Sequence, residues 1–121
     1  MPVLRDQLAH LVALPGVRAV VLAGRDGLTI EAAGHGDQRV FDALGALGAS
    51  MLGTSEALGQ ELGSGAAVGV ILEYASGLVA VDPIGPFATL VTLAESAASL
   101  GRLRHGVSMA RPELLQALDA Q

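Results

Sequence analysis

The chain has 121 residues, which predicts one domain over residues 1–121. Its 51% of hydrophobic and 16% of charged residues exclude intrinsic disorder, and its net charge of −5 argues against a nucleic-acid partner. The sequence contains neither Cys nor Lys, which excludes a disulfide framework, a thiolate zinc site, a Walker A loop and a Schiff-base lysine.

The first third of the chain predicts a helix followed by a β-hairpin. Leucines recur at helical spacing over residues 3–14, and Pro15-Gly16 ends this helix. VRAVVLA (17–23) is apolar on both faces, as in a strand that is covered on both sides. LTIEAA (28–33) alternates apolar and polar residues, and the short turn over 24–27 joins the two strands.

The rest of the chain predicts a long helix, three strands and a final helix. Helical spacing runs from about 38 to 62, and Gly63 is well placed as a left-handed C-cap. Strands are expected over 66–74, 77–82 and 86–94, with Asp82-Pro83-Ile84-Gly85 as a type I turn. The last helix begins at about Ser96 and is expected to kink or restart at Pro112. The order α-β-β-α-β-β-β-α indicates an α+β fold, a mostly antiparallel sheet with helices on both faces.

Two rows of side chains follow the long helix. Large apolar residues recur at helical spacing, and we expect this row to pack on the chain's own sheet: Val40, Leu44, Leu47, Met51, Leu58 and Leu62. Glycine inside a helix costs about 1 kcal/mol relative to Ala, so the second, glycine-rich row calls for an explanation. We expect it to meet the same helix of a second copy across a two-fold axis, the alternative being that it packs on the sheet. This predicted dimer interface consists of Phe41, Gly45, Gly48, Leu52, Ser55 and Gly59.

The strand over 66–74 has an unprotected face. Ala67, Gly69 and Ile71 alternate with Val68, Val70 and Leu72, and no charge or proline interrupts the run before Glu73. An exposed edge of this kind invites pairing with another strand. Ala67, Gly69 and Ile71 are therefore added to the predicted dimer interface.

No residue pattern predicts catalysis, a metal site or a cofactor. His10, His35 and His105 lack the i, i+4 spacing of a helical metal site, and there is no G-x-S-x-G or G-x-G-x-x-G sequence. The first ten residues carry charges where a secretory signal is apolar, and no stretch of about 20 residues is free of charge. We therefore expect no membrane insertion, and the lack of Cys agrees with a reducing, cytoplasmic location.

Two segments carry a resemblance that covers about residues 3–119. LPGVRAVVLAGRDGLTI (14–30) and GLVAVDPIGPFATLVTL (77–93), with the Ala/Leu/Gly-rich helix between them, resemble the Roadblock (dynein light-chain) family. The resemblance implies a five-stranded antiparallel sheet with one helix on one face and two on the other. It also implies a homodimer formed through the middle helix and the third strand. Bacterial members of the MglB type act on small Ras-like GTPases as activating proteins or scaffolds, without inserting an arginine finger.

The functional hypothesis is therefore a non-enzymatic homodimer that binds a small Ras-like GTPase, as a regulator or a scaffold. Candidate residues for contact with the GTPase are Asp42, Glu56 and Gln60, on the outward flank of the middle helix. The alternative is a small-molecule sensor or a purely structural dimerisation module without a GTPase partner. A sensor would need a concave pocket with a few convergent polar groups. An enzyme ranks last, because no acid–base pair or nucleophile stands out.

Overall fold

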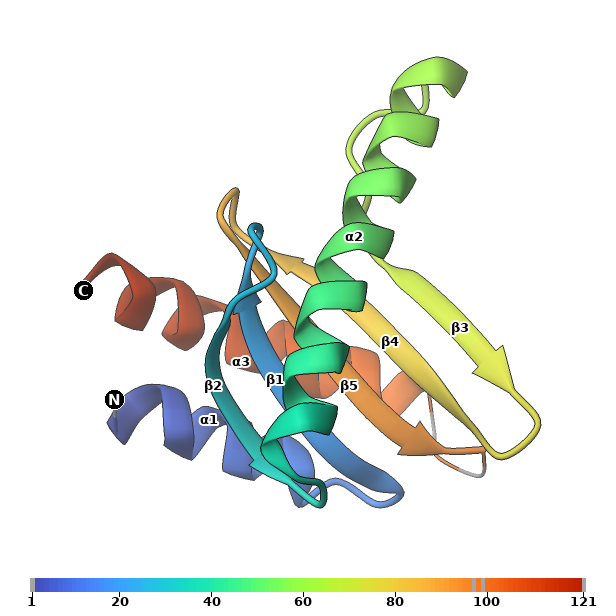
Figure 1. Cartoon of the computed structure of the whole chain (residues 1–121). Coiled ribbons are helices and arrows are strands. Elements are labelled where there is room, and N and C mark those ends of the chain that lie inside the picture. The colour runs from blue at the N-terminus through green and yellow to red at the C-terminus, as the bar shows by residue number, and fades with distance from the viewer. Residues whose placement is uncertain (1, 97, 99, 121) are drawn as a thin grey trace.

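The computed structural model describes residues 2–96, 98 and 100–120, and its elements follow the predicted order. They are α1 (Pro2–Val12), β1 (Val17–Gly24), β2 (Thr29–Gly34), α2 (Gln38–Leu62), β3 (Val70–Tyr74), β4 (Gly77–Ile84), β5 (Ala88–Glu95) and α3 (Leu100–Asp119). The five strands form one antiparallel sheet in the order β2-β1-β5-β4-β3. Helix α2 covers one face alone, while α1 and α3 lie side by side on the other face (Figure 1).

Each face of the sheet has its own apolar core. The larger core lies between the sheet and α1 and α3, and includes Leu8, Leu22, Leu90 and Leu114, all fully buried. The smaller core lies under α2 and is built on Leu52, Val81 and Val91. Successive residues of a strand point to opposite faces, so β4 and β5 supply both cores and are mostly apolar.

Local sequence sets both ends of α2. The Asp37 side chain accepts a hydrogen bond of 2.9 Å from the Val40 backbone N–H, as an N-cap does. At the other end Gly63 has φ of 64°, and Gly63 and Ser64 donate to the carbonyls of Gln60 and Gly59. This left-handed cap was predicted from the glycine and is confirmed.

Two predicted boundaries are wrong around the free side of β4. The predicted turn at Asp82–Gly85 is strand up to Ile84, and the turn lies at residues 85–87 instead. Proline is tolerated here because the pairing of β3 with β4 ends at Val81, so β4 has no neighbour on that side at Pro83. The strand that was predicted from residue 66 begins at Val70, because its pairing with β4 begins only there.

The predicted break at Pro112 is also wrong, because α3 continues through it to Asp119. A proline removes one backbone donor from a helix, and here the loss is offset by burial on both sides of it, at Ala110 and Leu114. The predicted start of this helix, at about Ser96, lies four residues before the observed start at Leu100, and residues 97 and 99 are outside the described part. None of the described helices is long and apolar enough to cross a membrane.

Candidate functional site

The two rows of α2 have exchanged their predicted roles. Gly45, Gly48 and Leu52 face the chain's own sheet and are buried. A Cβ atom on Gly45 would lie 3.2 Å from the Ala23 Cβ, and one on Gly48 would overlap Val91 Cγ2. The prediction that these three residues contact a second copy is therefore wrong, because the sheet already occupies their face of the helix.

The large apolar row is the one that faces outward. Leu47 is 67% exposed, Leu58 is 59% exposed and Leu62 is 67% exposed, although this row was expected to pack on the sheet. The physical reason is that the sheet is lined by branched side chains such as Val91, and only a smooth helix face can approach it closely. The glycines of α2 thus bring the helix onto the sheet and leave Leu47, Leu58 and Leu62 uncovered, whereas Leu44 packs on the smaller core.

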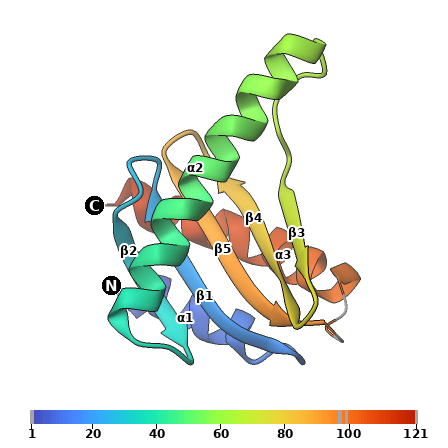
Figure 2. The same cartoon turned by 45° about the vertical axis from the view of Figure 1, so that its right-hand side comes forward.

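Helix α2 is also longer than the sheet is wide. Its 25 residues span about 37 Å, whereas five strands measure about 19 Å from the first strand to the last. Figures 1 and 2 show its C-terminal half standing clear of the sheet, with the following segment returning to β3. We call residues 56–62 the overhang. The length of α2 was predicted from the sequence. Comparing it with the width of a five-stranded sheet would have indicated that the large apolar row extends beyond the sheet.

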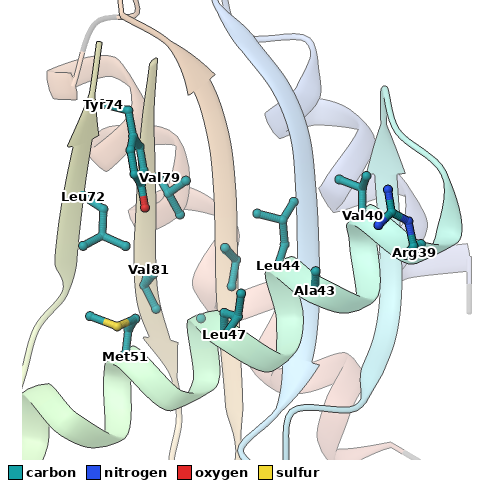
Figure 3. A pocket seen from close by; sticks show the side chains of 12 residues that line it. Arg39, Val40, Ala43, Leu44, Leu47, Met51, Leu72, Tyr74, Val79 and Val81 are labelled. Carbon is teal, nitrogen blue, oxygen red and sulfur yellow. The ribbon is translucent and has the colours of Figure 1, made fainter. Parts of the chain in front are cut away.

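An apolar groove of about 270 Å³ lies beside α2 on its β3 side, above β3 and β4. Figure 3 shows the α2 side chains on one wall, with Leu72 and Tyr74 from β3 and Val79 and Val81 from β4 on the other. Its lining is almost wholly apolar, the polar contributions being the Arg39 guanidinium and the Tyr74 hydroxyl. The groove is lined by Arg39, Val40, Ala43, Leu44, Leu47, Gly48, Met51, Leu72, Tyr74, Val79, Val81 and Val91.

The groove ends at β3, an outer strand of the sheet. β3 pairs with β4 on one side, and no described strand pairs with its other side. Of the residues predicted here, Ile71 lies in β3 and packs into the core under α1 and α3. Ala67 and Gly69 precede β3, and Ala67 packs on the smaller core under α2. Side-chain contact with a second copy through these residues thus stays a prediction.

The three remaining interface residues of α2 are partly buried. Gly59 lies over the returning segment, where an added Cβ would be 2.9 Å from the Gly65 carbonyl oxygen. Phe41 lies on the opposite side of the helix from the groove, in a hollow beside β2. Ser55 continues the row of Leu47 and Met51 by helical spacing.

The predicted GTPase-contacting residues lie on the flank of α2 that faces away from β3, and residues of β2 and of the β1–β2 turn hold two of them, Asp42 and Glu56. The exposed Asp42 carboxylate accepts hydrogen bonds from Thr29 Oγ1 at 2.7 Å and Gln38 Nε2 at 2.8 Å. These two donors lower the pKa of Asp42 below its usual value. Gln60 is exposed on the same flank, one turn beyond Glu56. We call Asp42, Glu56 and Gln60 the outer flank.

Sequence reasoning missed Arg25, which holds Glu56 in place. Its Nη1 lies 2.6 Å from Glu56 Oε1, and its guanidinium also donates to the carbonyls of Gly85 and Ala88. The β1–β2 turn, the β4–β5 turn and α2 are thereby tied together by one side chain. The only sequence signal was an arginine in a turn, which does not reveal its partners.

The described residues contain no group of three or more His, Asp or Glu side chains that could hold a metal ion. Thr89 and Thr92 are fully buried, and their hydroxyls have no hydrogen-bond partner in the described part of the chain. Neither threonine lines the groove. The surface features of the described chain are thus an apolar groove, the overhang, the outer edge of β3 and the outer flank.

Comparison with known proteins identifies the family. The Roadblock/LC7 domain matches residues 4–94. The chain belongs to the Roadblock/LC7 domain family. Among curated proteins, no sequence matches it.

Solved structures place the fold in the same family. A Roadblock/LC7 domain from Streptomyces avermitilis superposes with a TM-score of 0.88 at 25% identity, over 93% of this chain and 95% of that one. Myxococcus xanthus MglB gives a TM-score of 0.87 at 21% identity, over 98% and 90%. A structure of MglB with a tetrameric arrangement gives 0.82 at 23% identity, over 92% and 84%. The MglB structures establish a common fold, and the resemblance predicted from the two sequence segments is confirmed.

Proposed function

We propose that this Roadblock/LC7 domain is a homodimeric, non-enzymatic regulator or scaffold that binds a small Ras-like GTPase. The observation that carries the proposal is the uncovered apolar surface formed by the groove and the overhang of α2. Burying one leucine side chain contributes about 1.5–3 kcal/mol, so leaving Leu47, Leu58 and Leu62 in water forgoes a large stabilisation. A second copy of the chain that covers these leucines would supply that stabilisation.

The unpaired edge of β3 also favours association with a second copy of the chain. A strand edge with unpaired backbone groups pairs readily with another strand. Pairing between the β3 edges of two copies would join two sheets into one and would place the two α2 helices on the same face. The tetrameric arrangement of a solved MglB is a further reason to expect self-association in this fold.

The outer flank supports the contact with the GTPase. Asp42, Glu56 and Gln60 lie on the side of α2 away from β3, so they stay accessible when β3 and the groove are covered by a second copy. Asp42 leaves a negative charge on this flank that no basic side chain offsets, since its partners Thr29 and Gln38 are neutral, and this favours a basic group on the partner. Arg25 and Thr29 hold the two carboxylates in fixed positions, so little conformational freedom would be lost on binding.

A regulatory role would work through the partner's own nucleotide site. The Arg25 guanidinium beside the outer flank is engaged by Glu56 and two carbonyls, so it does not reach toward a partner. The outer flank would instead order the GTPase residues that stabilise the charge of phosphoryl transfer. Stimulated hydrolysis is the stronger form of this proposal, and scaffolding without stimulation is the weaker form.

A tagged pull-down from native lysate tests the proposal, with GDP or a non-hydrolysable GTP analogue added and the retained proteins identified by mass spectrometry. We expect a small GTPase to be retained mainly with the analogue, and an Asp42→Ala, Glu56→Ala double variant to retain less of it. Retention of no GTPase in either nucleotide state would reject the regulator, leaving a structural dimerisation module. Light scattering on the purified chain should give twice its mass of 12.2 kDa.

The groove also gives a reason to test the small-molecule alternative. It is apolar with Arg39 and Tyr74 among its lining residues, a composition that suits an elongated apolar molecule with an anionic head. Native mass spectrometry of the purified chain would show such a ligand as a fixed mass increment. A groove that is covered by a second copy would give the unliganded dimer mass.

A further inference from the structure

β2 is the second outer strand of the sheet, at the opposite side from β3. It pairs with β1 on one side, and no described strand pairs with its other side (Figure 1). The His35 N–H donates to the carbonyl of Arg18, and three positions further along the same pair of strands Val21 lies opposite Ala32. Because bonded and non-bonded pairs alternate along an antiparallel ladder, the Ala32 N–H and C=O point away from β1. The middle of β2 therefore offers a backbone donor and acceptor to a further strand.

A hollow of about 730 Å³ lies beside this edge, between β2 and the first half of α2, and we call it the β2 hollow. Ala32 is on the same face of the sheet as Val21, since the two are opposite each other, and a Cβ on Gly45 of α2 would lie 3.5 Å from Val21 Cγ1. A strand added to β2 would thus direct alternate side chains toward α2 and into the hollow. Phe41 and Leu28, which is 70% exposed, line the hollow and would supply apolar contacts to such a side chain.

The charge at the β2 hollow selects the kind of partner. Within the described chain, both hydrogen bonds to the Asp42 carboxylate, from Thr29 and Gln38, reach Oδ1, so Oδ2 can accept from a partner. No arginine or histidine is among the residues that line the hollow. A fixed carboxylate is matched by a lysine or arginine, whose charge-assisted hydrogen bonds are the stronger ones. The two outer strands, β2 and β3, carry no basic residue, so charge complementarity favours a different protein over the edge strand of another copy.

We propose that the partner of the outer flank docks through an extended segment that pairs with the backbone of Ala32 at the edge of β2. The segment places an apolar side chain in the β2 hollow, and its next side chain on the same face, a lysine or arginine, binds Asp42. This inference rests on the proposed function, because Asp42 belongs to the outer flank and the partner is the GTPase proposed there, and it adds the mode of contact. It uses neither β3 nor the groove, so the homodimer leaves the segment's site accessible.

Two substitutions at Ala32 test the strand pairing. Ala32→Pro removes the N–H that points away from β1, and proline is tolerated at such a position of an edge strand. Ala32→Ser keeps the N–H and is the matched control. The probe is the small GTPase that the pull-down retains, purified and loaded with the non-hydrolysable GTP analogue. In calorimetry its dissociation constant should rise about tenfold with Ala32→Pro and stay unchanged with Ala32→Ser.

Amide hydrogen exchange on the wild-type chain keeps the test independent of any effect of the proline on folding. NMR measures this exchange residue by residue. The Ala32 N–H should exchange at least about tenfold more slowly when the GTPase is bound. The Ala33 N–H, which points toward β1, should be much less affected and serves as the internal control.

Three side-chain variants test the contacts in the β2 hollow. Leu28→Ala should weaken binding about tenfold, because it removes an apolar contact. Met109→Ala is the matched control, since Met109 is 67% exposed but lies on α3, and its affinity should be unchanged. Asp42→Asn keeps the shape of the side chain and removes its charge, so the affinity of this variant should depend less on salt concentration than that of the wild-type chain.

The outcomes separate this inference from the proposed function. Slower exchange at Ala32 together with weaker binding by Ala32→Pro supports the docked segment. An Ala32 amide that exchanges equally fast with and without the bound GTPase overturns the strand pairing and leaves the GTPase contact standing. A tetrameric mass in light scattering that Ala32→Pro reduces to a dimer assigns the edge to another copy and also overturns the inference. If the wild-type chain retains no GTPase, the proposed function and the inference are overturned together.

Discussion

Two alanine substitutions in the same helix should have opposite effects on stability. Gly48 and Gly53 are both interior to α2, so replacing either with Ala gains about 1 kcal/mol of helix propensity. At Gly53 no described atom beyond the neighbouring backbone of α2 lies within 4 Å of the added Cβ, so the whole gain should be realised. We expect Gly53→Ala to raise the free energy of unfolding by about 1 kcal/mol.

At Gly48 the added methyl group meets the sheet. It overlaps Val91 Cγ2, and Val91 Cβ and Cγ1 are each 3.4 Å away. Val91 is fully buried in the central part of the sheet, and its branched side chain has few alternative rotamers. Overpacking of this kind costs about 1–3 kcal/mol, which cancels or exceeds the gain in propensity. Gly48→Ala should therefore be less stable than Gly53→Ala by about 1–3 kcal/mol.

Urea unfolding followed by circular dichroism measures this difference. All three proteins should be compared at one protomer concentration, because association makes apparent stability depend on concentration. In thermal unfolding the two variants should differ by at least about 3 °C. If Gly48→Ala proves as stable as Gly53→Ala, the close approach of α2 to the sheet at Gly48 is refuted, and with it our reason why the leucine row faces outward.

Other predictions concern the groups that hold the fold and the outer flank. Arg25→Ala should lower the free energy of unfolding by about 1 kcal/mol in urea titration, because it removes a partly exposed ion pair and two bonds to carbonyls, whereas Glu56→Gln should cost less. Burial raises the pKa of Asp82, so its contribution to stability is present below the unfolded value of about 4 and is lost as pH rises through the folded value. Asp82→Asn should therefore gain stability over the natural chain as pH rises from about 3 to 7, and an unchanged difference across this range would contradict the assignment. Thr89→Val should stabilise by about 1 kcal/mol, since its buried hydroxyl has no hydrogen-bond partner among the described residues, and a loss of stability would indicate a partner there.

Local features of this fold were predictable because neighbouring residues determine them. Gly63 caps α2 because a left-handed residue is needed where the helix ends, and the β1–β2 hairpin follows from a short turn between two strand patterns. The order of elements and the family resemblance were likewise visible in the sequence. Pro83 was misassigned because a proline in a turn and a proline at an unpaired strand edge give the same sequence signal, and only the structure shows that β3 begins at Val70 and leaves Pro83 unpaired on that side.

The sequence by itself determined that α2 carries a row of small residues and a row of large apolar residues, since helical periodicity alone separates them. Which row packs on the sheet was decided only by the tertiary structure, because periodicity does not encode the shape of the opposing surface. Val91 beneath Gly48 requires the smooth row, and the width of the sheet leaves Leu58 and Leu62 without cover. The outer flank is a similar case: the sequence placed Asp42 and Glu56 on one side of a helix, and only folding brought Thr29 and Arg25 beside them.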